Sequence, residues 1–253
     1  MSADHDAEQD AEREASAPPP PRRSAAGGVF AAIKETVLVV AVALVVSLVV
    51  KTFLLQAFFI PSQSMEETLD IGDRVIVSKL TPGPFDLHRG DVVVFSDPGN
   101  WLSQTAPPER GPVGTVVAEA LTFIGLLPED SDDHLIKRVI GLPGDHVVCC
   151  DASGQITVND EPVDETSYLA QGAAPSLDPF DVTVPEGQLW VMGDNRDESA
   201  DSRYNRESQP YHGFVPVDLV VGRAYAVVWP VSHWDWLGTP SAFDQVSGAP
   251  GAS

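Results

Sequence analysis

The chain has 253 residues, enough for one large or two small domains, and its 43% hydrophobic content is enough to bury a core. The formal net charge of −22 argues against nucleic-acid binding, because phosphate recognition needs clustered Lys and Arg. The 22 prolines and 20 glycines, with little helical periodicity after residue 60, predict short strands joined by turns.

The chain begins with a polar tail that leads into a long apolar run. Residues 1–28 are rich in Ala, Pro, Asp and Glu and cannot bury a core, so we expect a disordered cytoplasmic tail. No residue from Thr36 to Val50 is charged, and the run resumes after Lys51 and continues to Ile60. Because a ~30 Å hydrocarbon layer takes about 20 residues of helix, both parts are expected to contribute to a transmembrane anchor over residues 29–58.

Two other interpretations of the apolar run are disfavoured. A cleavable signal peptide would not follow so long and acidic a region, and no A-x-A site comes after the run. A buried core helix would be apolar on one stripe rather than all round. The N-terminal side of the run carries the basic residues Arg13, Arg22, Arg23 and Lys34, which favour a cytoplasmic location for that side. We therefore expect a single-pass protein of the plasma membrane with its main domain outside.

The region after the anchor, residues 59–238, is expected to form a mainly β, largely antiparallel domain. The expected strands are short and rich in β-branched residues: 74–77, 91–95, 135–140, 145–149, 155–158, 181–184, 188–192 and 220–229. An insertion at 97–133 interrupts them, with an apolar stretch from Val113 to Leu127 that fits a short helix packed on the domain or a contact with the membrane surface. Trp234 and Trp236 fit either a core or a membrane interface. Residues 239–253 are expected to be a disordered C-terminal tail.

The two cysteines are adjacent, Cys149 and Cys150, at the end of an expected strand. Neighbouring side chains on a strand point to opposite faces, and a bridge between them would be strained, so we expect one buried and one partly exposed thiol. With no second pair in Cys or His, neither a metal site nor a cofactor is expected.

Ser64 is the candidate nucleophile, since it follows the anchor closely within Pro61-Ser62-Gln63-Ser64-Met65. A serine hydroxyl needs a base to take its proton, and no histidine lies in a recognisable triad context. Lys137 is the candidate base, because alternation along its strand places it on one face between Leu135 and Val139. Desolvation by such neighbours disfavours the ammonium and lowers the lysine pKa from about 10.4, which makes a neutral amine accessible near pH 8.

A dense polar run from Gly193 to Arg203 can build a network with more partners than a surface turn requires. Asp201 and Arg203 are expected to pair and fix the backbone, which leaves Ser199 free to orient an amine. A solvated charged loop is the alternative interpretation of this run.

The sequence resembles the bacterial type I signal peptidases in an ordered set of five segments. These are the anchor, the Ser64 segment, Arg89-Gly90-Asp91-Val92, the segment from Lys137 to Asp145 and the run from Gly193 to Arg203. The resemblance covers about residues 36–96 and 134–230. It implies a membrane-anchored Ser/Lys endopeptidase with a largely antiparallel β domain, which removes N-terminal signal peptides from exported preproteins.

The resemblance also implies roles for individual residues. Ser64 is the nucleophile and Lys137 the general base, and the Ser62 hydroxyl with the Ser64 N–H forms the oxyanion hole. Ser199 positions the lysine amine. Three charged residues support the site and four apolar ones line shallow substrate pockets: Asp194, Asp201 and Arg203, and Phe58, Ile60, Leu69 and Ile136.

The sequence departs from the family at Glu67, where proline is common, and a carboxylate close to Lys137 would raise its pKa. Within enzymes, a self-cleaving Ser/Lys repressor protease would carry a DNA-binding domain in place of the anchor. The Ser-x-x-Lys class is excluded because Met65-Glu66-Glu67 follows Ser64. Outside enzymes, the alternative is a membrane-tethered, non-catalytic β interaction module. The expected partners are preproteins and membrane lipid, without nucleic acid.

Overall fold

The computed structural model describes residues 25–99, 101–102, 133–208 and 210–248, and the chain divides into two compact units, Met1–Val45 and Val46–Ser253. The expected helix at Val113 to Leu127 and most of the expected N-terminal tail lie outside the described residues. The strands are β1 (Leu55–Phe59), β2 (Arg74–Ser78), β3 (Val92–Ser96), β4 (His134–Gly141), β5 (His146–Cys149), β6 (Ile156–Val158), β7 (Glu161–Pro162), β8 (Phe180–Thr183), β9 (Gln188–Met192), β10 (Val215–Pro216), β11 (Val220–Trp229) and β12 (Asp235–Trp236).

The helix α2 covers Ala25–Phe53 and is apolar around its whole circumference. Its segment Ala32–Phe53 is 22 residues long and has the length and composition of a membrane span. At 1.5 Å per residue such a segment is about 33 Å long, which matches a hydrocarbon core of ~30 Å.

The helix ends earlier than we expected, because the second part of the apolar run is not helical. Leu55–Phe59 forms β1 and pairs with β2, Leu55 opposite Ser78 and Phe59 opposite Arg74. Gln56 and Phe58 are buried while Leu55 and Phe59 are exposed, which is the period-2 pattern of a strand. Phe58 and Ile60 therefore belong to the core of the β domain.

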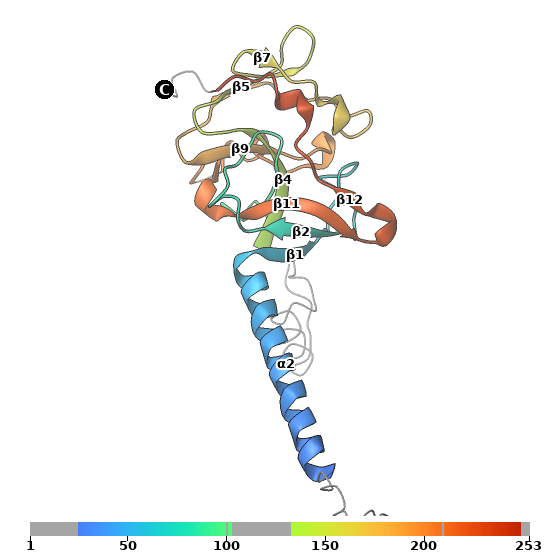
Figure 1. Cartoon of the computed structure of the whole chain (residues 1–253). Coiled ribbons are helices and arrows are strands. Elements are labelled where there is room, and N and C mark those ends of the chain that lie inside the picture. Colours follow the sequence, from blue (N-terminus) through green and yellow to red (C-terminus); the bar gives the residue numbers. More distant parts are fainter. Residues whose placement is uncertain (1–24, 100, 103–132, 209, 249–253) are drawn as a thin grey trace, which may run out of the picture. The chain divides into compact units, whose positions relative to one another are not determined.

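Two sheets make up the β domain, and all of their described pairings are antiparallel, which confirms the expected fold class (Figure 1). The larger sheet has the order β1-β2-β11-β3-β4-β9-β10, with β12 paired to β11, and the smaller has the order β7-β6-β5-β8. The nucleophile segment follows β1, the first strand of the larger sheet, and Lys137 lies on β4 of the same sheet.

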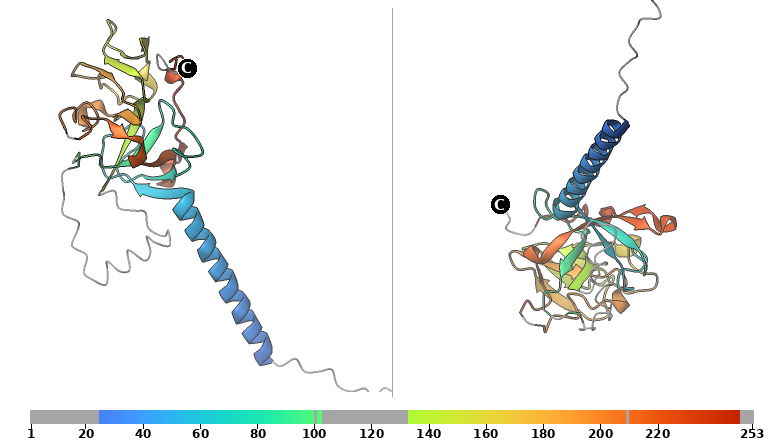
Figure 2. Two further views of the ribbon diagram at one scale, coloured as in Figure 1. Left: turned by 90° about the vertical axis from the view of Figure 1, so that its left-hand side faces the viewer. Right: turned by 90° about the horizontal axis from the view of Figure 1, so that it is seen from below.

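Residues of the expected C-terminal tail pack onto the domain in the part that the structure describes. Phe243 and Val246 are buried in the cluster that also holds Trp190 and Phe180. Gln245 donates a hydrogen bond to the Pro162 carbonyl, and the segment lies beside the smaller sheet (Figures 1 and 2). Buried apolar contacts, which the composition of this short segment does not reveal, hold it in place.

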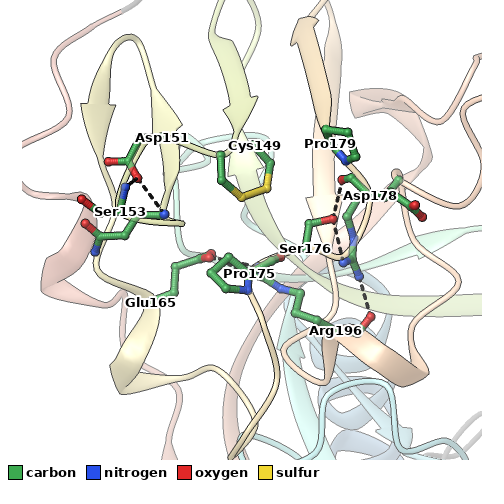
Figure 3. The surroundings of a disulfide bond; sticks show 12 residues. Cys149, Asp151, Ser153, Glu165, Pro175, Ser176, Asp178, Pro179 and Arg196 are labelled. Carbon is green, nitrogen blue, oxygen red and sulfur yellow. Dashed lines mark hydrogen bonds and ion pairs between the residues drawn. A yellow bond between two sulfur atoms is a disulfide. The ribbon is translucent and has the colours of Figure 1, made fainter.

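The expectation of two free thiols is wrong, because Cys149 and Cys150 form a disulfide. β5 ends at Cys149, so Cys150 lies outside the strand and the alternation of side chains no longer separates the two sulfurs. Figure 3 shows this bridge, with Glu165, Pro175 and Arg196 drawn nearby.

Candidate active site

Ser64 and Lys137, which are far apart in the sequence, meet in the structure. Lys137 Nζ lies 2.7 Å from Ser64 Oγ and donates a second hydrogen bond of 2.9 Å to the Ile136 carbonyl. Ser64 is 5% exposed and Lys137 is 4% exposed. The pair is therefore a hydroxyl and an amine in direct contact with little water around them.

Burial changes the protonation of Lys137. Desolvation lowers the pKa of its amine from 10.5 to about 8, against the carboxylates of Asp201 and Asp194, which raise it. Leu135 and Val139, on the same face of β4, are both buried in one apolar cluster. Near neutral pH an appreciable fraction of the amine is unprotonated and can accept the proton of the Ser64 hydroxyl.

Ser62 lies at the solvent side of the pair. Its Oγ is 3.4 Å from Ser64 Oγ, and the residue as a whole is exposed. A hydroxyl at this position can donate to an oxygen that develops negative charge beside Ser64.

The backbone of the polar run packs directly against Ser64. Asn195 N donates to the Ser64 carbonyl at 3.2 Å. A Cβ at Gly193 would overlap both that carbonyl oxygen and Ser199 Oγ, so only glycine fits there. Ser199 Oγ is buried and has no hydrogen-bond partner within the described part of the chain. The structure thus places Ser199 close to the pair, although the hydrogen bonds of Lys137 Nζ go to Ser64 and Ile136.

Two buried ion pairs hold this backbone in place. Asp201 accepts two hydrogen bonds from the Arg203 guanidinium, at 2.9 and 2.8 Å, and one from Gly193 N at 3.0 Å. Asp194 is bound in the same way by Arg138, at 2.8 and 2.6 Å, and accepts a third hydrogen bond from Thr68 Oγ1. Bidentate guanidinium–carboxylate pairs fix direction as well as distance.

The hydrogen-bond partners of Asp194 were not predicted from the sequence. Arg138 is on the opposite face of β4 from Lys137, and Thr68 lies in the turn after Ser64, so one carboxylate joins all three catalytic segments. A buried pair of Arg196 with Glu165 was also missed. The alternation along β4, which separates Arg138 from Lys137, was the available signal for Arg138.

A pocket of about 220 Å³ opens beside the Ser64–Lys137 pair. Phe58, Ile60 and Ile136, three of the four expected pocket residues, line it. Leu69 lies outside this lining and packs in the buried cluster with Phe58 and Ile60. The lining also includes residues that were not expected: Trp101, Leu102, His134, Glu198 and Ala200.

Glu67 has a φ of +77°, a left-handed conformation that proline cannot adopt. Its side chain is exposed, and the carboxylates that raise the Lys137 pKa belong to Asp201 and Asp194. The departure at this position therefore changes the backbone of the turn rather than the charge around the amine.

Comparison with known proteins gives a consistent set of relatives. The sequence profile of the family described as signal peptidase, peptidase S26, matches residues 33–229. A probable signal peptidase I of Mycobacterium leprae (strain TN) is 38% identical over 234 residues, covering 82% of this chain and 80% of that protein. A signal peptidase I of Mycobacterium tuberculosis (strain CDC 1551 / Oshkosh) is 37% identical over 252 residues, covering 92% of this chain and 85% of that protein. Among solved structures, a signal peptidase I of Enterococcus faecalis V583 matches with a TM-score of 0.32 and 23% identity, covering 55% of this chain and 97% of that chain.

Proposed function

The chain belongs to the signal peptidase family, peptidase S26, and from this premise we propose that it cleaves N-terminal signal peptides from exported preproteins with Ser64 as nucleophile and Lys137 as general base. The observation that carries the assignment is the 2.7 Å contact between Lys137 Nζ and Ser64 Oγ, with the lysine pKa lowered to about 8. A buried, partly neutral amine in contact with a hydroxyl is the arrangement that nucleophilic attack by serine requires.

The reaction follows from these groups. Neutral Lys137 takes the Ser64 proton as Oγ attacks the carbonyl carbon of the residue before the cleaved bond. The Ser62 hydroxyl and the Ser64 N–H donate to the resulting oxyanion, and the Lys137 ammonium then gives its proton to the departing amine. The acyl-enzyme is hydrolysed when Lys137 deprotonates a water that attacks the ester, and the proton returns to Ser64 Oγ.

Asp194, Asp201, Arg203 and Ser199 support this chemistry without touching the reacting bond. The two carboxylates favour the ammonium that forms after proton transfer, since both raise the Lys137 pKa. Gly193 N, bound by Asp201, keeps the polar run against the Ser64 carbonyl. Ser199 Oγ lies next to this contact, where it can accept a hydrogen bond from the ammonium.

Phe58, Ile60 and Ile136 form shallow apolar walls, so side chains one and three residues before the cleaved bond should be small, as alanine is. The segment Ala32–Phe53 has the length of a membrane span, and we assign it as the anchor. The basic residues before it assign the N-terminal side to the cytoplasm and the β domain to the outer side of the plasma membrane. Substrate and enzyme then meet at the same bilayer.

The test is incubation of the detergent-solubilised full chain with a preprotein, followed by detection of the mature product. Ser64→Ala and Lys137→Arg should both abolish cleavage, the latter because guanidinium stays protonated. Ser153→Ala and Lys79→Arg, which change residues away from the site, are the matched controls and should cleave normally. Turnover by Ser64→Ala at the rate of the unchanged chain would exclude Ser64 as the nucleophile. Failure of the unchanged chain to cleave any preprotein would favour a non-catalytic module.

A further inference from the structure

One edge of β4 lies beside the Ser64–Lys137 pair, and within the described residues no strand is paired to this edge before Arg138. β3 pairs with β4 from His134 to Arg138, whereas the described pairing with β9 begins only at Arg138. Val139 N donates to the Asp91 carbonyl, so the backbone groups of Val139 and Lys137 point toward β3. By alternation those of Ile136 point to the other edge, and Lys137 Nζ reaches the Ile136 carbonyl there.

The two faces of β4 carry different apolar clusters at this edge. Ile136 packs with Phe58, Ile60 and Val94. Leu135 packs on the opposite face with Phe95 and Trp101, whose rings meet edge to face at 5.9 Å. Since the pocket takes lining residues from both clusters, it extends across this edge of β4. An extended peptide added at this edge sends alternate side chains to the two faces.

The wall on the Leu135 face comes from the first residues of the 97–133 insertion. The Asp97 carboxylate accepts hydrogen bonds from the N–H groups of Gly99, Trp101 and Leu102, at 2.9, 2.9 and 3.1 Å. Asp97 N is bound to the Asp133 carbonyl, which closes the base of the insertion. The chain is therefore turned back onto the sheet as soon as β3 ends, and Trp101 is only 8% exposed.

We propose that Leu135, Trp101 and Leu102 form a subsite for the side chain two residues before the cleaved bond, and that this subsite selects an apolar side chain. The inference rests on the proposed function, in which the side chains one and three residues before the bond face Ile136. The intervening side chain then faces Leu135, Trp101 and Leu102. Exposed Glu198 also lines the pocket, so an acidic side chain meets repulsion as well as desolvation.

The subsite is tested with peptides that carry Ala one and three residues before the cleaved bond and Leu, Ser or Asp between them. Burying part of a leucine side chain should make kcat/KM for the Leu peptide about five- to tenfold higher than for the Ser peptide, with Asp lowest. Trp101→Ala and Leu102→Ala should bring the Leu-to-Ser ratio toward one. Trp229→Ala removes an exposed tryptophan outside the pocket and should leave both the ratio and the rates unchanged.

A variant that introduces a charge into the subsite distinguishes a loss of side-chain recognition from a loss of folded protein. Leu102→Lys should reverse the order, so that the Asp peptide is cut faster than the Ser peptide, and an unstable protein cannot produce such a gain. Asp97→Ala, which removes the three hydrogen bonds that position Trp101 and Leu102, should lose the preference, whereas Asp97→Asn should retain part of it because its amide oxygen still accepts.

The outcomes distinguish two failures. An unchanged ratio in the Trp101 and Leu102 variants, or a change in preference at the third rather than the second residue before the bond, overturns the subsite while the peptidase assignment stands. Failure of the unchanged chain to cut any of these peptides overturns the proposed function and the subsite together.

Discussion

Raising the pH should convert Lys137 from an ammonium into a base, and the pH profile of cleavage should report that step directly. With a pKa of about 8, about a tenth of the amine is neutral at pH 7 and about nine tenths at pH 9. kcat/KM should therefore rise about tenfold over this interval and level off above it. An amine at its ordinary value of 10.5 would instead give a rise of about a hundredfold with no plateau.

The assay is kcat/KM for a fluorogenic peptide with Ala one and three residues before the cleaved bond, measured in detergent across the range, because this parameter follows the ionisation of the free enzyme. Asp201→Asn removes a carboxylate that raises the Lys137 pKa, so it should move the midpoint to lower pH. A profile without any rise between pH 7 and pH 9, or a midpoint above 10, would refute the assignment of Lys137 as a desolvated base.

Three further predictions test the surroundings of the pair. Ser62→Ala should reduce kcat by about one to three powers of ten with little change in KM, because one oxyanion donor is lost and the Ser64 N–H remains; a change confined to KM would make Ser62 a substrate contact. Gly193→Ala should abolish activity and lower the melting temperature, since its Cβ would overlap the Ser64 carbonyl oxygen and Ser199 Oγ. Gly154→Ala is the control for an added methyl group, because the new Cβ meets nothing within 4 Å. The φ of +82° at Gly154 adds some backbone strain to this control. Lys137→Met should be inactive, yet its folded state should be more stable than that of the unchanged chain by about 3 kcal/mol at pH 7. The lowered pKa of Lys137 means that the buried ammonium destabilises the folded state fully below about pH 8 and not at all above about pH 10.5. Denaturant unfolding of both proteins at pH 7 and pH 10.5 should show that the difference in unfolding free energy shrinks as the pH rises.

The alternation of residues along β4 was enough to predict that Lys137 is desolvated. Leu135 and Val139 flank it on one face, and local pattern decides which face a strand residue occupies. Strands such as β3, which covers Val92–Ser96, were also predictable because β-branched and aromatic residues dominate them. The pairing of Asp201 with Arg203 followed from their separation by a single residue.

Features that depend on distant partners were not predictable in this way. Leu55 to Phe59 reads as a continuation of the apolar run, and only its pairing with β2 makes it a strand. Trp101 lies in a stretch of loop composition, and its burial depends on three hydrogen bonds to Asp97 and on contact with Phe95. The burial of Phe243 likewise depends on a surface formed by residues far earlier in the chain.

The packing of Phe243 has a consequence for the order of folding during synthesis. Gly90 adopts a φ of +86°, and a Cβ there would come within 2.8 Å of the Phe243 ring, so the turn before β3 is shaped around a residue made more than 150 positions later. Arg89 and Asn159 also donate hydrogen bonds to the carbonyls of Val246 and Ser247. The core that joins the two sheets is therefore incomplete until residues up to Val246 have left the ribosome, and folding of the β domain as one cooperative unit must follow translation of nearly its whole length.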